Sequence, residues 1–316
     1  GSFSTAQVNA GVNIMQSAGG SSGSSQSGLS SPSSMQPFAG TPNISDDAVQ
    51  GQNRNTIVSN NSTTPPTTTP FEPAYAGFAS AIAGGSPRLG TTSLTVDAGA
   101  GTIEGGVTLN GGGGFSFGTE DATYNARDDF SASNVTGNLT TASSGQTLCT
   151  SCDFLSWGTW GTTPAGNPTV ASGYWTAGAA TTAQQLIDLS ETSTGSVSYA
   201  GSAVGHIKSG EDIHGATGTV TGSVNFGNRS GYVVFHDFGV DGDRKSFEYG
   251  ISYEAGANTF TETSVNDYSE TYTPGALSGQ FVNNGSTIAD GMTGNFEIEI
   301  PLQDWSAAGV FGAKRQ

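Results

Sequence analysis

Short runs in which apolar and polar residues alternate, separated by glycine-rich turns, recur along this chain. In one run Val197, Tyr199 and Ala203 alternate with polar residues, and the run from 247 to 253 repeats the pattern with aromatic side chains. Because successive side chains of a strand point to opposite faces, a period of two predicts strands with one buried face. The 48 glycines oppose helices, since each glycine inside a helix costs about 1 kcal/mol relative to alanine. We therefore predict an all-β chain whose only candidate helical turn lies at 184–189.

The charge of the chain limits its partners. Only 11% of the residues are charged, against roughly 25% in an average soluble domain, and 26 acidic residues face 9 basic ones for a net charge of −17. Phosphate backbones and anionic lipid headgroups would repel such a chain, which argues against nucleic acid as a partner. No apolar run approaches the roughly 20 residues of a membrane-spanning helix. Cations and basic proteins are the electrostatic partners that we expect.

Composition divides the chain into three parts. Residues 1–70 form a low-complexity arm with a Ser/Gly tract and a Thr/Pro tract. Residues 71–148 carry short strand patterns with glycine-rich turns, which predict a small antiparallel sheet or sandwich. Residues 149–316 hold the most regular series of short strands, which predicts an up-and-down β-barrel or a sandwich.

One strand pattern lies inside the arm. Every second residue from 6 to 14 is apolar, and these residues would share one face of a strand: Ala6, Val8, Ala10, Val12 and Ile14. The strand could pair within its own chain. It could instead be donated to a neighbouring copy, adding a strand to an open sheet as pilus donor strands do. We take it as the candidate assembly strand.

The two cysteines, Cys149 and Cys152, form a single CxxC pair. Such a pair is a structural disulfide, a redox couple or half of a zinc site. Zinc would need two more ligands, and His206, His214 and His236 are too scattered to supply them. A redox couple would sit at the start of a helix, whereas an aromatic strand pattern follows here. We predict a structural disulfide, with the other two interpretations left open, and hence an oxidising location.

Acidic residues offer one candidate metal site. Asp237, Asp241 and Asp243 lie close together in a predicted turn, and Ca²⁺ takes roughly six to eight oxygen ligands. The acidic pairs at 128–129 and 211–212 are weaker candidates. An ordinary acidic turn would explain the same pattern. Calcium is therefore the one cofactor that we consider.

No pattern for catalysis stands out, and we predict that the chain is not an enzyme. The sequence holds no Gly-x-Ser-x-Gly turn between a strand and a helix. His236 and Asp237 are adjacent in a strand pattern, so their side chains should point to opposite faces. By the same parity Trp157 and Trp160 should lie on opposite faces, which argues against a shared sugar-binding platform.

Several stretches of the C-terminal half resemble a known family. The strongest is the ending GVFGAKR at 309–315, and the others lie at 199–205, 222–227, 279–281 and 292–296. Together they resemble the barrel of transferrin-binding-protein-B-like surface proteins of bacteria. The stretch around the cysteines at 149–161 is similar to the segment that precedes this barrel in some FecR-domain proteins.

The resemblance implies an eight-stranded, tightly filled β-barrel over about residues 149–316, displayed on a bacterial cell surface or outside the cell. It implies no particular ligand, since family members that capture host iron proteins use variable loops. From the arm we expect a structural subunit of an extracellular fibre or surface layer, in which copies of the chain are linked by donation of the N-terminal strand. The alternative is a monomeric surface-binding protein that captures a nutrient protein or a host protein.

Overall fold

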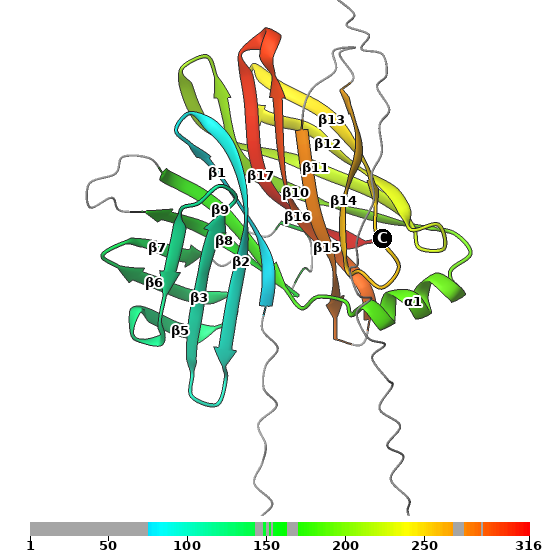
Figure 1. Ribbon diagram of the computed structural model, residues 1–316, viewed down its shortest axis with the longest axis horizontal. Coiled ribbons are helices and arrows are strands. Elements are labelled where there is room, and N and C mark those ends of the chain that lie inside the picture. The colour runs from blue at the N-terminus through cyan, green and yellow to red at the C-terminus, as the bar shows by residue number, and fades with distance from the viewer. Residues whose placement is uncertain are drawn as a thin grey trace, which may run out of the picture. The chain divides into compact units, whose positions relative to one another are not determined.

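The computed structural model describes residues 75–142, 148–149, 152, 154–162, 170–267, 275–285 and 287–316. The candidate assembly strand at 6–14 lies outside these residues, so its pairing stays a prediction. The predicted all-β class is confirmed. Apart from one α-helix and two short 3₁₀ turns, the described elements are strands, and they form two antiparallel sheets (Figure 1).

The first sheet has nine strands in the order β4-β3-β2-β1-β9-β8-β7-β6-β5. Its elements are β1 (Tyr75–Ala83), β2 (Ser86–Asp97), β3 (Thr102–Leu109), β4 (Gly114–Phe117), η1 (Thr119–Asp121), β5 (Ala122–Ala126), β6 (Asp129–Asn134), β7 (Gly137–Thr141), β8 (Leu155–Thr162) and β9 (Val170–Gly178). The tight β1–β2 turn uses Gly84 and Gly85, whose φ angles of 60° and 79° are readily adopted only by glycine. One face of the sheet buries a core that includes Leu94, Phe130 and Trp175.

The second sheet closes on itself as a barrel of eight strands in chain order. Its elements are β10 (Ser196–Ser209), β11 (Asp212–Asn225), β12 (Ser230–Val240), β13 (Asp243–Ser252), β14 (Thr259–Asp267), β15 (Gly275–Asn284), β16 (Thr287–Ile300), η2 (Pro301–Gln303) and β17 (Trp305–Arg315). Each strand is antiparallel to the next, and β17 pairs back with β10 to close the ring. The predicted eight-stranded up-and-down barrel is therefore present.

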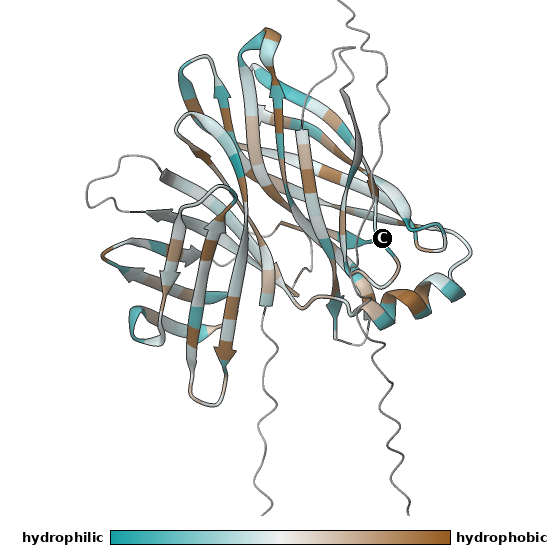
Figure 2. Cartoon of the chain, viewed as in Figure 1, coloured by the Kyte–Doolittle hydropathy of each residue, from teal (hydrophilic) through white to brown (hydrophobic). Residues whose placement is uncertain are grey.

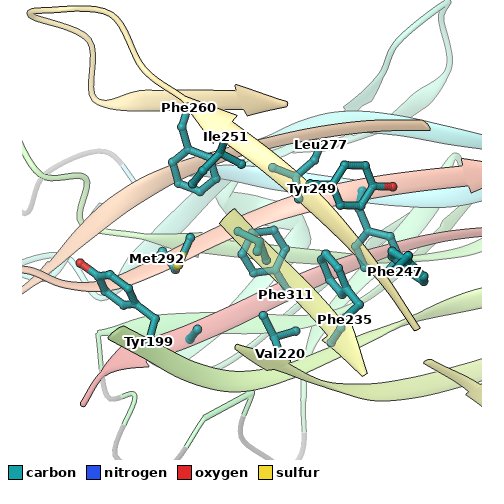
Figure 3. Packing of buried hydrophobic residues seen from close by; sticks show 14 of the residues in the cluster. Tyr199, Val220, Phe235, Phe247, Tyr249, Ile251, Phe260, Leu277, Met292 and Phe311 are labelled. Atoms are coloured by element: carbon teal, nitrogen blue, oxygen red, sulfur yellow. The ribbon is translucent and has the colours of Figure 1, made fainter. Parts of the chain in front are cut away.

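Aromatic rings fill the interior of this barrel. The Phe235 ring centroid lies 4.2 Å from that of Phe296, 5.0 Å from that of Phe247 and 5.5 Å from that of Phe311. All four side chains are at most 1% exposed. Figure 3 shows Phe235 of β12, Phe247 and Tyr249 of β13, and Phe311 of β17 in this interior. The strand alternation seen in the sequence thus places one ring after another on the inner face.

The helix α1 (Ala183–Thr192) links the two sheets and contains the predicted helical turn at 184–189. A capping box starts it: the Thr182 hydroxyl accepts from the Gln185 N–H, and the Gln185 side chain accepts from the Thr182 N–H at 2.9 Å. Leu186 is buried against the barrel core, and the apolar positions of α1 are brown in Figure 2. None of the helices in the described part of the chain has the length and apolar character needed to span a membrane.

The boundary between the two sheets differs from the one expected at residue 149. β8 and β9 follow that residue, yet both pair in the nine-stranded sheet, and the barrel starts at Ser196. The reason is a pairing of β9 with β1, in which Ala76 lies opposite Gly178. The local alternation of apolar and polar residues cannot predict a strand pairing between residues so far apart along the chain.

Polar side chains on the outside of the barrel join it to the nine-stranded sheet. Asn295 of β16 is buried, and its Nδ2 donates to the carbonyl oxygens of Ala79 at 2.7 Å and Gly90 at 2.8 Å. Gln280 of β15 donates from Nε2 to the carbonyl oxygen of Ala76 at 2.8 Å. Backbone atoms of β1 and β2 therefore receive donors from barrel side chains, which fixes how the two sheets pack.

Candidate functional site

Because aromatic side chains fill the barrel, its outer surface is the place for a binding site, and two hairpins meet at one end of the barrel. The turns β10–β11 and β16–β17 meet there: the Gly210 N–H donates to the Asp304 carbonyl oxygen at 2.9 Å, and Lys208 Nζ lies 3.7 Å from Asp304 Oδ1. We call residues 208–216 and 300–306 the hairpin end. Figure 1 shows the two hairpins as long neighbouring ribbons.

The hairpin end exposes two large apolar side chains. Ile213 is 50% exposed and Leu302 is 86% exposed. In Figure 2 the tips of these hairpins combine hydrophilic and hydrophobic positions. Scattered apolar residues are normal on a protein surface, whereas two large ones on hairpins that contact each other make this end a candidate interaction site. Sequence reasoning missed both residues, because alternation predicts which residues can be buried and not which turns will meet.

β11 also has a free backbone edge at the hairpin end. Residues 212–216 pair with β10, but the pairing of β11 with β12 starts only at Thr217, opposite Gly239. Within the described residues, this segment therefore has a neighbouring strand on one side only. Its unpaired backbone groups could accept one more strand.

The three aspartates of the candidate calcium site do not converge. Asp241 Oδ1 lies 3.0 Å from Arg244 Nη2, and Asp243 Oδ1 lies 3.4 Å from Lys245 Nζ. No group of three or more His, Cys, Asp or Glu residues that could hold a metal occurs in the described residues, which include Asp237 and the acidic pairs at 128–129 and 211–212. Asp241 and Asp243 instead pair with basic side chains that follow in β13 (Asp243–Ser252).

The prediction that His236 and Asp237 face opposite ways is wrong, because β12 carries a bulge. Phe235 pairs with Phe247, but the next paired residue is Phe238, and both Phe235 and Phe238 are fully buried inside the barrel. A bulge inserts an extra residue, so the two residues between them both face outward. The structure thus brings His236 and Asp237 to the same outer face, where the histidine Nε2 lies 2.8 Å from a threonine hydroxyl of β11.

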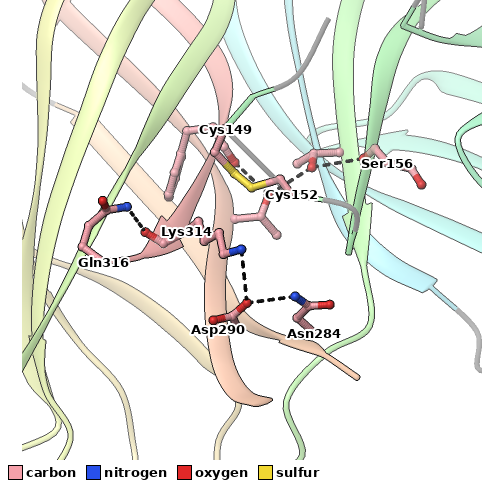
Figure 4. The surroundings of a disulfide bond; sticks show 10 residues. Cys149, Cys152, Ser156, Asn284, Asp290, Lys314 and Gln316 are labelled. Atoms are coloured by element: carbon pink, nitrogen blue, oxygen red, sulfur yellow. Dashed lines mark hydrogen bonds and ion pairs between the residues drawn. A yellow bond between two sulfur atoms is a disulfide. The ribbon is translucent and has the colours of Figure 1, made fainter. Parts of the chain in front are cut away.

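A disulfide joins Cys149 and Cys152, and both residues are buried (Figure 4). They cluster with Phe154, Leu155 and Val282, the last of which belongs to β15 of the barrel. The disulfide therefore holds a short segment between the nine-stranded sheet and the barrel wall. It is shielded from solvent, as expected of a structural bond rather than of a redox couple that exchanges with partners.

Gly291 and Gly312 make room for this segment on the barrel wall. A Cβ atom added at Gly291 would clash with the ring of Phe154, and one at Gly312 would lie 2.7 Å from Leu155 Cδ1. Each glycine thus leaves space into which an apolar side chain of the disulfide segment packs. This explains a glycine requirement within regular strands, where glycine otherwise weakens the structure.

His206 of β10 is half-buried and faces β9 of the nine-stranded sheet. Its Nε2 lies 3.5 Å from Ser172 Oγ, its ring centroid lies 5.0 Å from that of Tyr174, and its Nδ1 is buried without a hydrogen-bond partner. Burial lowers the pKa of His206 below its ordinary value, which favours the neutral ring. The neutral ring packs the barrel against β9.

Trp157 and Trp160 lie on opposite faces of their strand, as the sequence predicts. Trp160 is buried in the core of the nine-stranded sheet, whereas Trp157 is half-buried on the other face, where it packs against a small cluster that includes Leu148 and Val204. The two rings thus lie on opposite faces of β8. Trp157 remains accessible on the side that faces the barrel wall.

No family model matches this sequence, and no curated protein sequence matches it. Several solved structures are similar to it. A variant of Transferrin Binding Protein B from Haemophilus parasuis is 12% identical, with a TM-score of 0.41 over 78% of this chain and 76% of that one. Transferrin binding protein B from Neisseria meningitidis is 15% identical, with a TM-score of 0.40 over 73% of this chain and 53% of that one. The haemoglobin receptor HpuA from Kingella denitrificans is 14% identical, with a TM-score of 0.40 over 81% of this chain and 92% of that one. The expected link to FecR-domain proteins stays a prediction.

Proposed function

We propose that this protein is a non-catalytic binding protein of a bacterial cell surface that captures another protein with its hairpin end. The observation that carries the proposal is the exposure of Ile213 and Leu302 on two hairpins that contact each other through Gly210 and Asp304. An apolar patch at the centre of a contact, surrounded by polar residues, is the common plan of a protein interface. The filled barrel supports the same conclusion, because its interior leaves the outer surface for binding.

Charge favours a basic partner. Glu211 in the β10–β11 turn and Asp212 at the start of β11 precede Ile213, and the whole chain carries a net charge of −17. A surface of this sign attracts positively charged proteins and speeds their association. The partner that fits is therefore a protein with a basic surface around an apolar contact.

Replacing Ile213 and Leu302 together by serine should weaken capture by about tenfold or more, the equivalent of roughly 1.4 kcal/mol. Both side chains are exposed, so we expect the folded state to lose little stability. Binding of immobilised protein to transferrin and haemoglobin at micromolar concentration, read by surface plasmon resonance, measures this. Tyr232→Ser is the matched control, because Tyr232 is also exposed but lies at the start of β12. Failure of both iron carriers to bind, or equal binding by the double variant, would contradict the proposal.

Assembly of the chain into polymers is the second candidate function, and the free edge of β11 at 212–216 favours it. A strand donated by another copy would pair with this edge through backbone hydrogen bonds. The donated strand would be the apolar-faced segment at 6–14. Copies joined in this head-to-tail manner would form an open fibre.

Deleting residues 1–16 should convert polymers of the full chain into monomers if this second function is right. Size-exclusion chromatography and negative-stain microscopy would distinguish the two states. As a matched pair, Val8→Asp should abolish polymers, because it puts a charge on the apolar face, whereas Asn9→Asp on the opposite face should leave them intact. Monomers from the full chain would rule assembly out.

A further inference from the structure

A groove of about 580 Å³ lies along the outer wall of the barrel, bordered by Leu148 and by Trp157 of β8, and its lining includes neither Ile213 nor Leu302. The residues that matter for its chemistry are Leu148, Trp157, Thr219, His236, Asp237 and Arg244. Its volume falls within the roughly 300–1,000 Å³ of small-molecule sites. We propose that this groove binds a neutral saccharide.

The backbone at Asp237 gives the first argument. Asp237 lies inside β12 with a φ angle of 51°, a left-handed conformation that is costly for a residue with a side chain. Two hydrogen bonds hold it there: its N–H donates to Ser246 Oγ at 3.0 Å, and Arg244 Nη1 donates to its carbonyl oxygen at 3.0 Å. Glycine would take this conformation without strain. Strain that the surroundings maintain is characteristic of functional positions.

The facing strand is adapted to the same bulge. A Cβ atom added at Gly218 of β11 would lie 2.9 Å from the His236 carbonyl oxygen and 2.9 Å from Phe238 Cα. The close approach of the two backbones therefore requires glycine. Because of the bulge, His236 and Asp237 both line the groove although they are adjacent in the sequence.

The lining matches the two kinds of surface that a sugar ring presents. A sugar has a C–H face, which packs on an aromatic ring, and a rim of hydroxyl groups, which both donate and accept hydrogen bonds. Trp157 and Leu148 supply the apolar side of the groove. The Asp237 carboxylate accepts hydrogen bonds, the Arg244 guanidinium donates them, and the Thr219 hydroxyl does both.

Charge argues for a neutral ligand. The groove carries one carboxylate and one guanidinium, so it offers no excess of positive charge to hold an anion on a chain with a net charge of −17. A purely apolar ligand would strip water from Asp237 and Arg244 without replacing its hydrogen bonds, which is unfavourable. A neutral polyhydroxyl compound avoids both penalties.

Saturation-transfer NMR with a panel of neutral mono- to tetrasaccharides of hexoses and N-acetylhexosamines, each at millimolar concentration, tests the proposal. We expect at least one member of the panel to bind the unaltered chain. Trp157→Ala and Asp237→Gly should each weaken binding about tenfold. Asp237→Gly should keep or raise the melting temperature, because it removes the backbone strain.

Tyr232→Ala is the control, since it removes another aromatic side chain from β12 outside the groove, and its sugar binding should equal that of the unaltered chain. The Ile213→Ser and Leu302→Ser double variant should also bind sugar normally, which separates this site from protein capture at the hairpin end. Absence of binding by the whole panel would overturn the proposal. Unchanged binding by both Trp157→Ala and Asp237→Gly, or a lowered melting temperature of Asp237→Gly with unchanged binding, would overturn it too.

Discussion

Replacing Phe235 by alanine is expected to lower the free energy of unfolding by about 3–5 kcal/mol, the range measured when a large aromatic side chain is removed from a packed core. The Phe235 ring contacts the rings of Phe247, Phe296 and Phe311 inside the barrel and is fully buried. Its loss would leave a cavity that strands hydrogen-bonded on both sides cannot collapse to fill. Urea unfolding followed by circular dichroism measures the change.

Two matched variants sharpen this test. Tyr232→Ala changes an exposed aromatic residue on the same strand, so its effect should stay within about 0.5 kcal/mol. Phe235→Leu keeps much of the buried volume and should fall between the two. If Phe235→Ala and Tyr232→Ala proved equally stable, the ring cluster would not be the core that the structure describes.

Replacing Asn295 by aspartate is expected to lower the free energy of unfolding at neutral pH by roughly 3 kcal/mol or more, because it buries a charge without a partner. The two side chains have nearly the same shape, so packing is preserved. The Asn295 Nδ2 group donates to the carbonyl oxygens of Ala79 and Gly90, and its Oδ1 is buried without a donor. An ionised aspartate would present acceptor oxygens to two carbonyl oxygens in a buried contact.

The pH dependence of this variant has a definite sign. Burial and the facing carbonyl oxygens disfavour the charged form, so the pKa of the introduced carboxyl group in the folded protein is raised above the value of about 3.9 found in unfolded chains. The loss of stability relative to the unaltered chain is therefore full above the raised pKa and shrinks as the pH falls through it. At low pH the protonated group can again donate one hydrogen bond.

Urea unfolding of both chains between neutral and acidic pH measures the difference. Asn138→Asp is the control, because Asn138 is exposed on β7 and its replacement should cost little at any pH. A stability difference that stays constant with pH, or that grows as the pH falls, would contradict the buried contact between β16 and the sheet. A large loss with Asn138→Asp would point to charge in general instead.

The sequence predicted much of the fold because the information needed was local. The alternation around Tyr199 and Phe247 gave the strands and the inner face of the barrel, and both side chains are fully buried there. The helical turn at 184–189 also followed from local pattern. The alternation of faces along β8 correctly predicted that Trp157 and Trp160 lie on opposite sides of the sheet.

The alternation rule failed at His236 and Asp237, which line the candidate groove. A bulge at His236 and Asp237 shifts the pairing of β12 with β13, so two adjacent side chains share a face. The room for the bulge comes from Gly218 on the neighbouring strand β11. The alternation rule assumes that strands pair without bulges. The bulge in β12 depends on a glycine of the neighbouring strand, so the sequence of β12 alone could not reveal it.

By itself the sequence determined the all-β class, the short strands, the acidic charge and the faces of most strands, since each depends on residues a few positions apart. Only the tertiary structure decided that β9 pairs with β1, that the hairpins bearing Ile213 and Leu302 contact each other, and that basic neighbours pair with Asp241 and Asp243. These contacts depend on how distant strands close into sheets and on where side chains settle within a turn. Neither is encoded in the local alternation of apolar and polar residues, because the same alternation is compatible with many strand orders.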